Sequence, residues 1–84
     1  MRTFKWIDWN LRKIDANGLS AAEVEAAFDA VYSLKERDDG SFQMYARVPS
    51  GRQIWVLWRY DKEDESRDIL SELHTPPIFV ITAY

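Results

Sequence analysis

Residues 41–60 read SFQMYARVPSGRQIWVLWRY, and this stretch predicts the centre of the fold. From Ser41 to Val48 apolar side chains occupy every second position, which is the pattern of a half-buried strand. Pro49-Ser50-Gly51 supplies a turn, and Arg52 to Tyr60 then forms a second strand. Because the second strand has large apolar residues at both odd and even positions, we expect a central strand with both faces covered. The stretch therefore predicts a β-hairpin.

Two further strands are predicted at the ends of the chain. Phe4–Ile7 is short, aromatic and β-branched, and residues 78–84 form a stronger β-run that closes the sheet. Between the hairpin and the last strand lies a long charged connection, residues 61–77. Its acidic run, Asp61 to Asp68, lacks the glycine and the ligand spacing of a calcium loop. We therefore expect a solvated loop there.

Two helices are predicted between the first strand and the hairpin. The first runs from Trp9 to Ala16, with a side-chain cap offered by Asp8 and a left-handed stop at Gly18. The second begins at a capping box that is formed by residues 20–23. Its apolar residues recur at helical spacing, so we expect it to continue to about Leu34.

The order of elements predicts a single α+β domain over residues 1–84, β-α-α-β-β-β, with two N-terminal helices packed on a small antiparallel sheet. The chain has no Cys and one His, which excludes disulfides and thiolate zinc sites, so we expect neither a metal site nor a cofactor. Eleven basic and 14 acidic residues give a net charge of −3, so a nucleic-acid contact would need a local basic patch. No signal segment or membrane span is evident, and we expect a cytoplasmic protein without a membrane partner.

Several short motifs follow one another along the chain. They are Phe4-x-Trp6 followed by Asn10 and Lys13, Asn17-Gly18-x-Ser20, Glu23 to Phe28, Gly51-Arg52 before an apolar strand, and Val80-Ile81-Thr82-Ala83 at the end. In this order they resemble the RelE-type ribonuclease toxins of bacterial toxin–antitoxin systems, in particular the BrnT branch. The resemblance implies a RelE-like fold, a metal-independent mRNA endoribonuclease activity and a cognate antitoxin as partner.

The chain departs from that family at two positions. Asn17 stands where the family usually has His, and Tyr84 stands where its closing strand usually has Arg. A catalytically degenerate member of that family is therefore an alternative to an active ribonuclease.

Cleavage of RNA by its own 2′-hydroxyl needs cations at the phosphate and a group that transfers protons. As catalytic candidates we name Arg47 and Arg59 on the hairpin and His74, the single imidazole. The candidates for RNA binding are Arg12, Lys13, Tyr45, Arg52 and Tyr84. The hypothesis requires these side chains to converge on one basic hollow.

Two alternatives stay open. The basic residues would equally suit solvated sheet and helix positions, and His74 would suit an ordinary loop. The tryptophans could stack bases, but Trp55 and Trp58 fall on opposite faces of one strand, so at least one belongs to the core. The second functional hypothesis is a non-enzymatic interaction module that homodimerises or binds a partner through strand edges.

Overall fold

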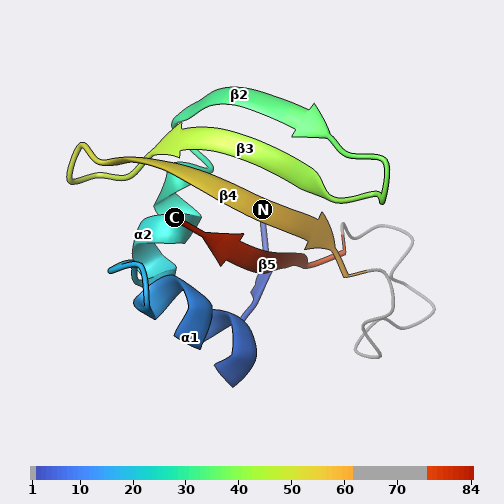
Figure 1. Cartoon of the computed structure of the whole chain (residues 1–84), viewed down its shortest axis with the longest axis horizontal. Helices are drawn as coiled ribbons and strands as arrows, with labels where there is room; N and C mark the ends of the chain where they lie inside the picture. The colour runs from blue at the N-terminus through green and yellow to red at the C-terminus, as the bar shows by residue number, and fades with distance from the viewer. Residues whose placement is uncertain (1, 62–75) are drawn as a thin grey trace.

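The computed structural model describes residues 2–61 and 76–84, which form a mixed five-stranded sheet with two helices on one face (Figure 1). The elements are β1 (Phe4–Lys5), α1 (Asp8–Asp15), α2 (Ala21–Ala27), β2 (Val31–Glu36), β3 (Phe42–Arg47), β4 (Gln53–Tyr60) and β5 (Ile78–Ala83). The predicted α+β class is confirmed. The predicted element order lacked one strand, β2.

The strands lie in the order β1-β5-β4-β3-β2. The predicted hairpin is β3–β4, with Met44 opposite Val56, and β4 has the predicted central place between β3 and β5. The prediction of a purely antiparallel sheet is wrong at β1, which pairs in parallel with β5. The first and last strands of the chain are therefore neighbours.

The predicted extension of the second helix to Leu34 is wrong. The capping box is confirmed, since the Ser20 hydroxyl accepts from the Glu23 amide and the Glu23 carboxylate accepts from the Ser20 amide. However, α2 ends at Ala27, and residues 31–36 pair with β3 as β2. A valine, a tyrosine and a leucine within four residues suit a strand, and the pairing gives β3 a backbone partner on its outer side.

The turn predicted at Asp39-Gly40 joins β2 to β3 as a second hairpin. Gly40 has a φ of 87°, and the Arg37 amide donates to the Ser41 carbonyl at 2.8 Å. The Ser41 hydroxyl and backbone amide both donate to the Asp39 carboxylate, at 2.6 and 2.9 Å. These bonds, the hydroxyl first, lower the pKa of Asp39, because they favour its charged form.

The core lies between the helices and one face of the sheet. Even-numbered residues of β3 and β4 point into it, together with residues of β5 and one side of each helix. Its buried members include Ile14, Val24, Ala27, Phe28, Met44, Ala46, Ile54, Val56, Trp58, Ile78 and Val80. The prediction that both faces of β4 are covered holds only on this face, where α1 and α2 lie (Figure 1). On the other face Gln53 and Arg59 are exposed, and Trp55 and Leu57 are half-buried.

A buried asparagine fixes α1 to the sheet. The first helix begins at Asp8, and Asn10 rather than Asp8 supplies the cap, because the Asn10 side-chain oxygen accepts from the Ile7 amide at 2.8 Å. The Asn10 amide group donates to the carbonyls of Lys5 and Val80, both at 3.0 Å. Asn17, two turns later, donates to the Ala83 carbonyl at 3.0 Å. Thus α1 and the turn after it satisfy two carbonyls of β5.

No helix among the described residues is long and apolar enough to cross a membrane.

Candidate nucleic-acid interface

The face of the sheet opposite α1 and α2 will be called the open face. Odd-numbered residues of β3 and β4 point to it, together with the residues that pair with them on β2 and β5. These residues are Ser33, Lys35, Gln43, Tyr45, Arg47, Gln53, Trp55, Leu57, Arg59, Phe79, Thr82 and Tyr84, with Tyr32 at the β2 bulge. The surface is thus built from strands that are separated widely in the sequence.

Four aromatic side chains cross the open face from β2 to the end of β5, and we call them the aromatic row. The ring centroids of Tyr32 and Tyr45 are 5.7 Å apart, and those of Tyr45 and Trp55 are 4.8 Å apart. Tyr84 lies directly opposite Trp55, because the two residues exchange backbone hydrogen bonds of 2.8 and 3.0 Å. Directly opposed residues share a face, so Tyr84 completes the row.

The aromatic row is accessible at both ends. Tyr32 is 53% exposed and Tyr84 is 50% exposed, whereas the two central rings are half-buried. The Tyr45 hydroxyl donates to the Gln53 side-chain oxygen at 2.6 Å, which fixes its ring. Trp58 points to the other face and is 5% exposed, so the expected division of Trp55 and Trp58 between surface and core is confirmed. The row is a platform of partly fixed rings.

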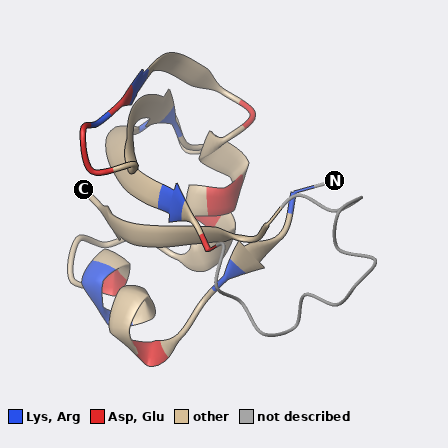
Figure 2. Cartoon of the chain, turned by 90° about the vertical axis from the view of Figure 1, so that its right-hand side faces the viewer, with Lys and Arg blue, Asp and Glu red and all other residues tan. Residues whose placement is uncertain are grey.

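Cations flank the aromatic row. Arg47 lies two residues from Tyr45 on β3, and Lys35 pairs with Gln43, two residues from Tyr45 on the other side. No Asp or Glu lies on the open face of β2–β5 within the described ranges. Figure 2 shows acidic segments on the helices and in connections. Glu36 of β2 pairs with the core-side residue Phe42. The chain is acidic overall, but the described strand residues of its open face include cations and aromatic rings and no carboxylate. At the β2–β3 turn, Lys35 and Gln43 line a hollow together with Glu36, Asp38 and Asp39.

A second group of rings and cations lies where α1 meets β5. The Trp9 ring stacks on Phe79 with centroids 5.9 Å apart, and the Lys13 ammonium lies 4.6 Å from the Trp9 centroid. The Arg59 guanidinium lies 4.7 Å from the Phe79 centroid. These cation–π contacts position Lys13 over Trp9 and Arg59 over Phe79, and neither cation forms an ion pair among the described residues.

The structure places Arg47 and Arg59 on one face but does not bring them together. Arg47 pairs with Gln53, and Arg59 is six residues further along β4, which corresponds to about 20 Å. One phosphate cannot contact both guanidinium groups across that distance. Neither arginine forms an ion pair within residues 2–61 and 76–84. Among the described residues, neither guanidinium is thus held by a carboxylate.

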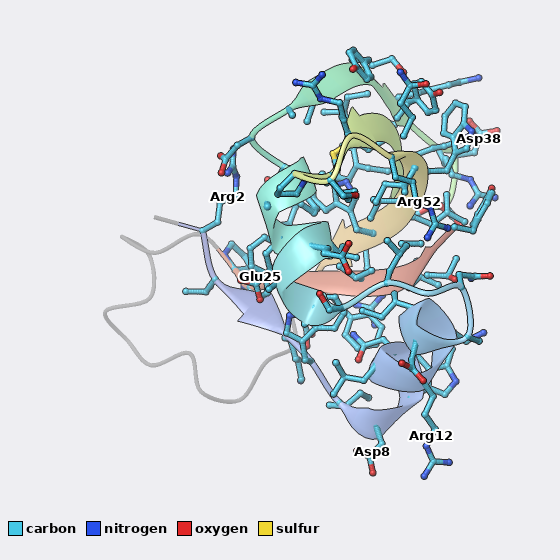
Figure 3. All side chains as sticks on the ribbon, turned by 90° about the vertical axis from the view of Figure 1, so that its left-hand side faces the viewer. Arg2, Asp8, Arg12, Glu25, Asp38 and Arg52 are labelled. Carbon is cyan, nitrogen blue, oxygen red and sulfur yellow. The ribbon has the colours of Figure 1, made fainter. Side chains whose placement is uncertain are left out.

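The other sequence-predicted residues divide into three groups. Tyr45 and Tyr84 belong to the aromatic row, and Lys13 belongs to the second group of rings. Arg52 lies in the β3–β4 turn beside Gly18, and Arg12 points away from the body of the fold (Figure 3). His74 lies outside the described residues. The expected single basic hollow is thus not formed by the described candidates.

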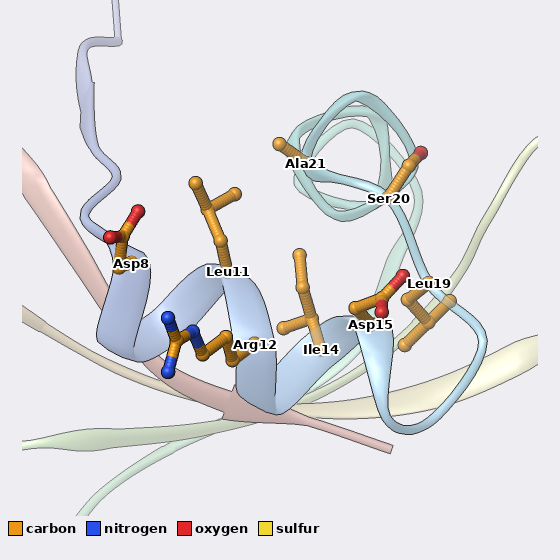
Figure 4. A pocket seen from close by; sticks show the side chains of 8 residues that line it. All are labelled: Asp8, Leu11, Arg12, Ile14, Asp15, Leu19, Ser20 and Ala21. Carbon is orange, nitrogen blue, oxygen red and sulfur yellow. The ribbon is translucent and has the colours of Figure 1, made fainter.

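Arg12 also lines a hollow of about 310 Å³ between α1 and the start of α2 (Figure 4). Its apolar wall includes Leu11, Ile14 and Leu19, while Asp8 and Asp15 contribute carboxylates. Acidic residues outnumber basic ones in the lining of the hollow, so it is a poor site for a phosphate. Nor do the described residues contain a His, Cys, Asp or Glu cluster that could hold a metal ion.

Sequence reasoning missed Tyr32, because the predicted helix included it. The available signal was an aromatic and β-branched run followed by Asp39-Gly40, a dipeptide that favours hairpins.

Comparisons of the chain with protein-family models, with curated proteins and with solved structures find no match. The resemblance to RelE-type toxins therefore stays a hypothesis that rests on the motifs alone.

Proposed function

We propose that this domain binds single-stranded nucleic acid, in the first place RNA, across its open face. The observation that carries the proposal is the aromatic row with Lys35 and Arg47 on either side. Aromatic side chains on an exposed sheet stack unpaired bases, while nearby cations contact phosphates. The absence of carboxylates from the described strand residues of this face favours a polyanionic ligand.

The shape of the platform selects single strands. The rings lie in the sheet surface rather than on a protruding helix, so they do not enter the groove of a duplex. Unpaired bases can lie flat on such rings whatever their identity, since every base has a π-face. We therefore expect little sequence preference and a clear preference for single strands.

Binding is tested with a fluorescently labelled single-stranded RNA, a DNA of the same sequence and the matching RNA duplex. Tyr32→Ala and Tyr84→Ala each remove one exposed ring, which corresponds to about 1–3 kcal/mol per stacked base, or roughly 5- to 150-fold weaker binding. Tyr32→Phe and Tyr84→Phe keep the rings and are expected to bind nearly as the wild type does. Fluorescence anisotropy gives the dissociation constants.

Leu11→Ala is the control variant, because it shortens an exposed apolar side chain on α1 rather than in the aromatic row. It should not change the dissociation constants. Arg47→Gln should lower the salt dependence of binding by about one phosphate contact, a change of about 0.7 in the slope of log K against log salt. Wild-type protein that binds none of the three probes, or alanine variants that bind as tightly as wild type, would overturn the proposal.

A metal-independent endoribonuclease of the RelE type is the second candidate. It is supported by the motifs and by the place of Arg47, which lies opposite Gln53, the residue whose side chain accepts from the Tyr45 hydroxyl. Arg47 has no carboxylate partner in the described part of the chain. In this proposal Arg47 neutralises the phosphorane and the antitoxin covers the open face. Cleavage of labelled RNA in EDTA that is lost in Arg47→Ala and kept in Leu11→Ala would support it. Intact RNA after prolonged incubation with folded protein would exclude it.

A further inference from the structure

Strand β2 is an exposed edge strand with apolar side chains. It is the last strand of the sheet, and all six of its residues are exposed. Val31, Tyr32 and Leu34 are 42%, 53% and 55% exposed. Natural edge strands are usually short or covered, because an open edge pairs readily with another chain. This edge has six exposed residues, and the protection it carries is the bulge at Tyr32 and the charges of Lys35 and Glu36.

The backbone of β2 has hydrogen-bonding groups that point away from the sheet. The Arg37 amide donates to the directly opposite Ser41 carbonyl, and bonded and non-bonded pairs alternate along an antiparallel ladder. Lys35 and Ser33 therefore bond to β3, whereas Leu34 and Glu36 direct their N–H and C=O groups outward. A second strand could accept and donate these bonds.

The opposite side of the sheet offers a smaller edge. The strand β1 has two residues, and beyond it Asn10 of α1 and Asn17 of the following turn donate their side-chain amides to carbonyls of β5. The two sides of the sheet therefore differ: one is shielded by a helix, and the other presents a six-residue strand.

We propose that two copies of this chain associate through antiparallel pairing of their β2 strands, centred on Leu34. In this register the two Leu34 residues exchange backbone bonds, and their exposed side chains contact each other. Lys35 then lies opposite Ser33 of the second copy, and the regular pairing ends there, because the bulge turns Tyr32 to the open face whereas Glu36 points to the core side. No like charges are directly opposed. Centring on Lys35 or on Glu36 would oppose two equal charges, which is unfavourable.

The proposed pairing joins the two sheets into one. Directly opposed residues point to the same side, so the open faces of both copies form one continuous surface. The two aromatic rows would then be neighbours through their Tyr32 ends. The dimer does not depend on nucleic-acid binding, and it is measured without nucleic acid.

A six-residue strand pair buries less than the roughly 1,200 Å² of a standard stable interface, so we expect a weak, concentration-dependent dimer. Sedimentation velocity over a wide concentration range measures it. Leu34→Lys adds a charge at the centre of the pairing, and Leu34→Pro removes an outward N–H while leaving the bonds between β2 and β3 in place. Both variants are expected to stay monomeric where wild type dimerises.

Leu11→Lys makes the same change at an exposed leucine of α1 and should dimerise as the wild type does. Far-UV circular dichroism checks that each variant is folded. If Leu34→Pro is unfolded, the test rests on Leu34→Lys. A wild type that is monomeric at the highest attainable concentration overturns the proposal. So does a folded Leu34→Lys variant that dimerises like wild type.

Discussion

Asn10 is the residue that connects the first strand, the first helix and the last strand. Its side chain is fully buried and takes part in three hydrogen bonds, one accepted from Ile7 and two donated to Lys5 and Val80. A buried backbone group that loses its partner costs more free energy than an exposed one, because water cannot replace the bond. The motif that contributed to the family resemblance thus has a structural role here.

Replacing Asn10 by alanine should therefore destabilise the domain strongly. Asn10→Ala leaves two carbonyls and one amide without their partner, and we expect a loss on the order of 3 kcal/mol in the free energy of unfolding. Asn17→Ala is the matched control, because this exposed side chain makes one bond to β5, and it should cost about 1 kcal/mol. Urea denaturation measures both. Equal losses in the two variants would contradict the structural role of Asn10.

At the scale of elements, β2 separates what the sequence could predict from what it could not. A valine, a phenylalanine and a second valine at positions 24, 28 and 31 fit a helical stripe, so Val31 was assigned to the helix. In the structure the stripe ends at Phe28, and Val31 is 42% exposed on a strand. Spacing alone does not distinguish the two, because the choice is made by the pairing of residues 31–36 with a strand beyond the turn.

Hydrogen exchange distinguishes the strand from the helix. In β2 the amides of Ser33 and Lys35 bond to β3, so in dilute monomer they should exchange slowly, whereas those of Leu34 and Glu36 should exchange fast. A helix that continued to Leu34 would protect consecutive amides from 31 to 34. An alternating pattern in amide-resolved NMR supports β2, and uniform protection contradicts it.

The same limit applies to the candidate site. Alternation predicts that Tyr45 and Arg47 share one face of their strand, which is confirmed, because side-chain direction along a strand is a local property. Alternation could not predict the separation of about 20 Å between Arg47 and Arg59, nor which residue of the last strand lies opposite Trp55. That neighbour is Tyr84, which comes from the other end of the chain and depends on the order of strands in the sheet. The aromatic row is therefore a property of the topology.

For the molecule as a whole, the distribution of charge matters more than its sum. A net charge of −3 argues against general attraction to nucleic acid. Yet no described strand residue of the open face is acidic, whereas Lys35, Arg47 and Arg59 lie on it. Carboxylates come near this face at the β2–β3 turn, where Asp38 and Asp39 line a hollow with Lys35. Since interactions between exposed charges are screened over about 8–10 Å at physiological salt, a ligand on this face experiences mainly its local charges. An acidic protein can in this way have a basic binding surface.

The most direct measurement is an NMR titration of the protein, labelled with ¹⁵N, with a short single-stranded RNA. Trp55 lies in the aromatic row and Trp58 in the core, so their indole N–H signals report on the two faces of one strand. The account predicts that the Trp55 indole signal and the amide signals around Tyr32 and Tyr84 shift progressively, while the Trp58 signal stays in place. An unchanged spectrum at saturating RNA, or shifts confined to the hollow between α1 and α2, would contradict it.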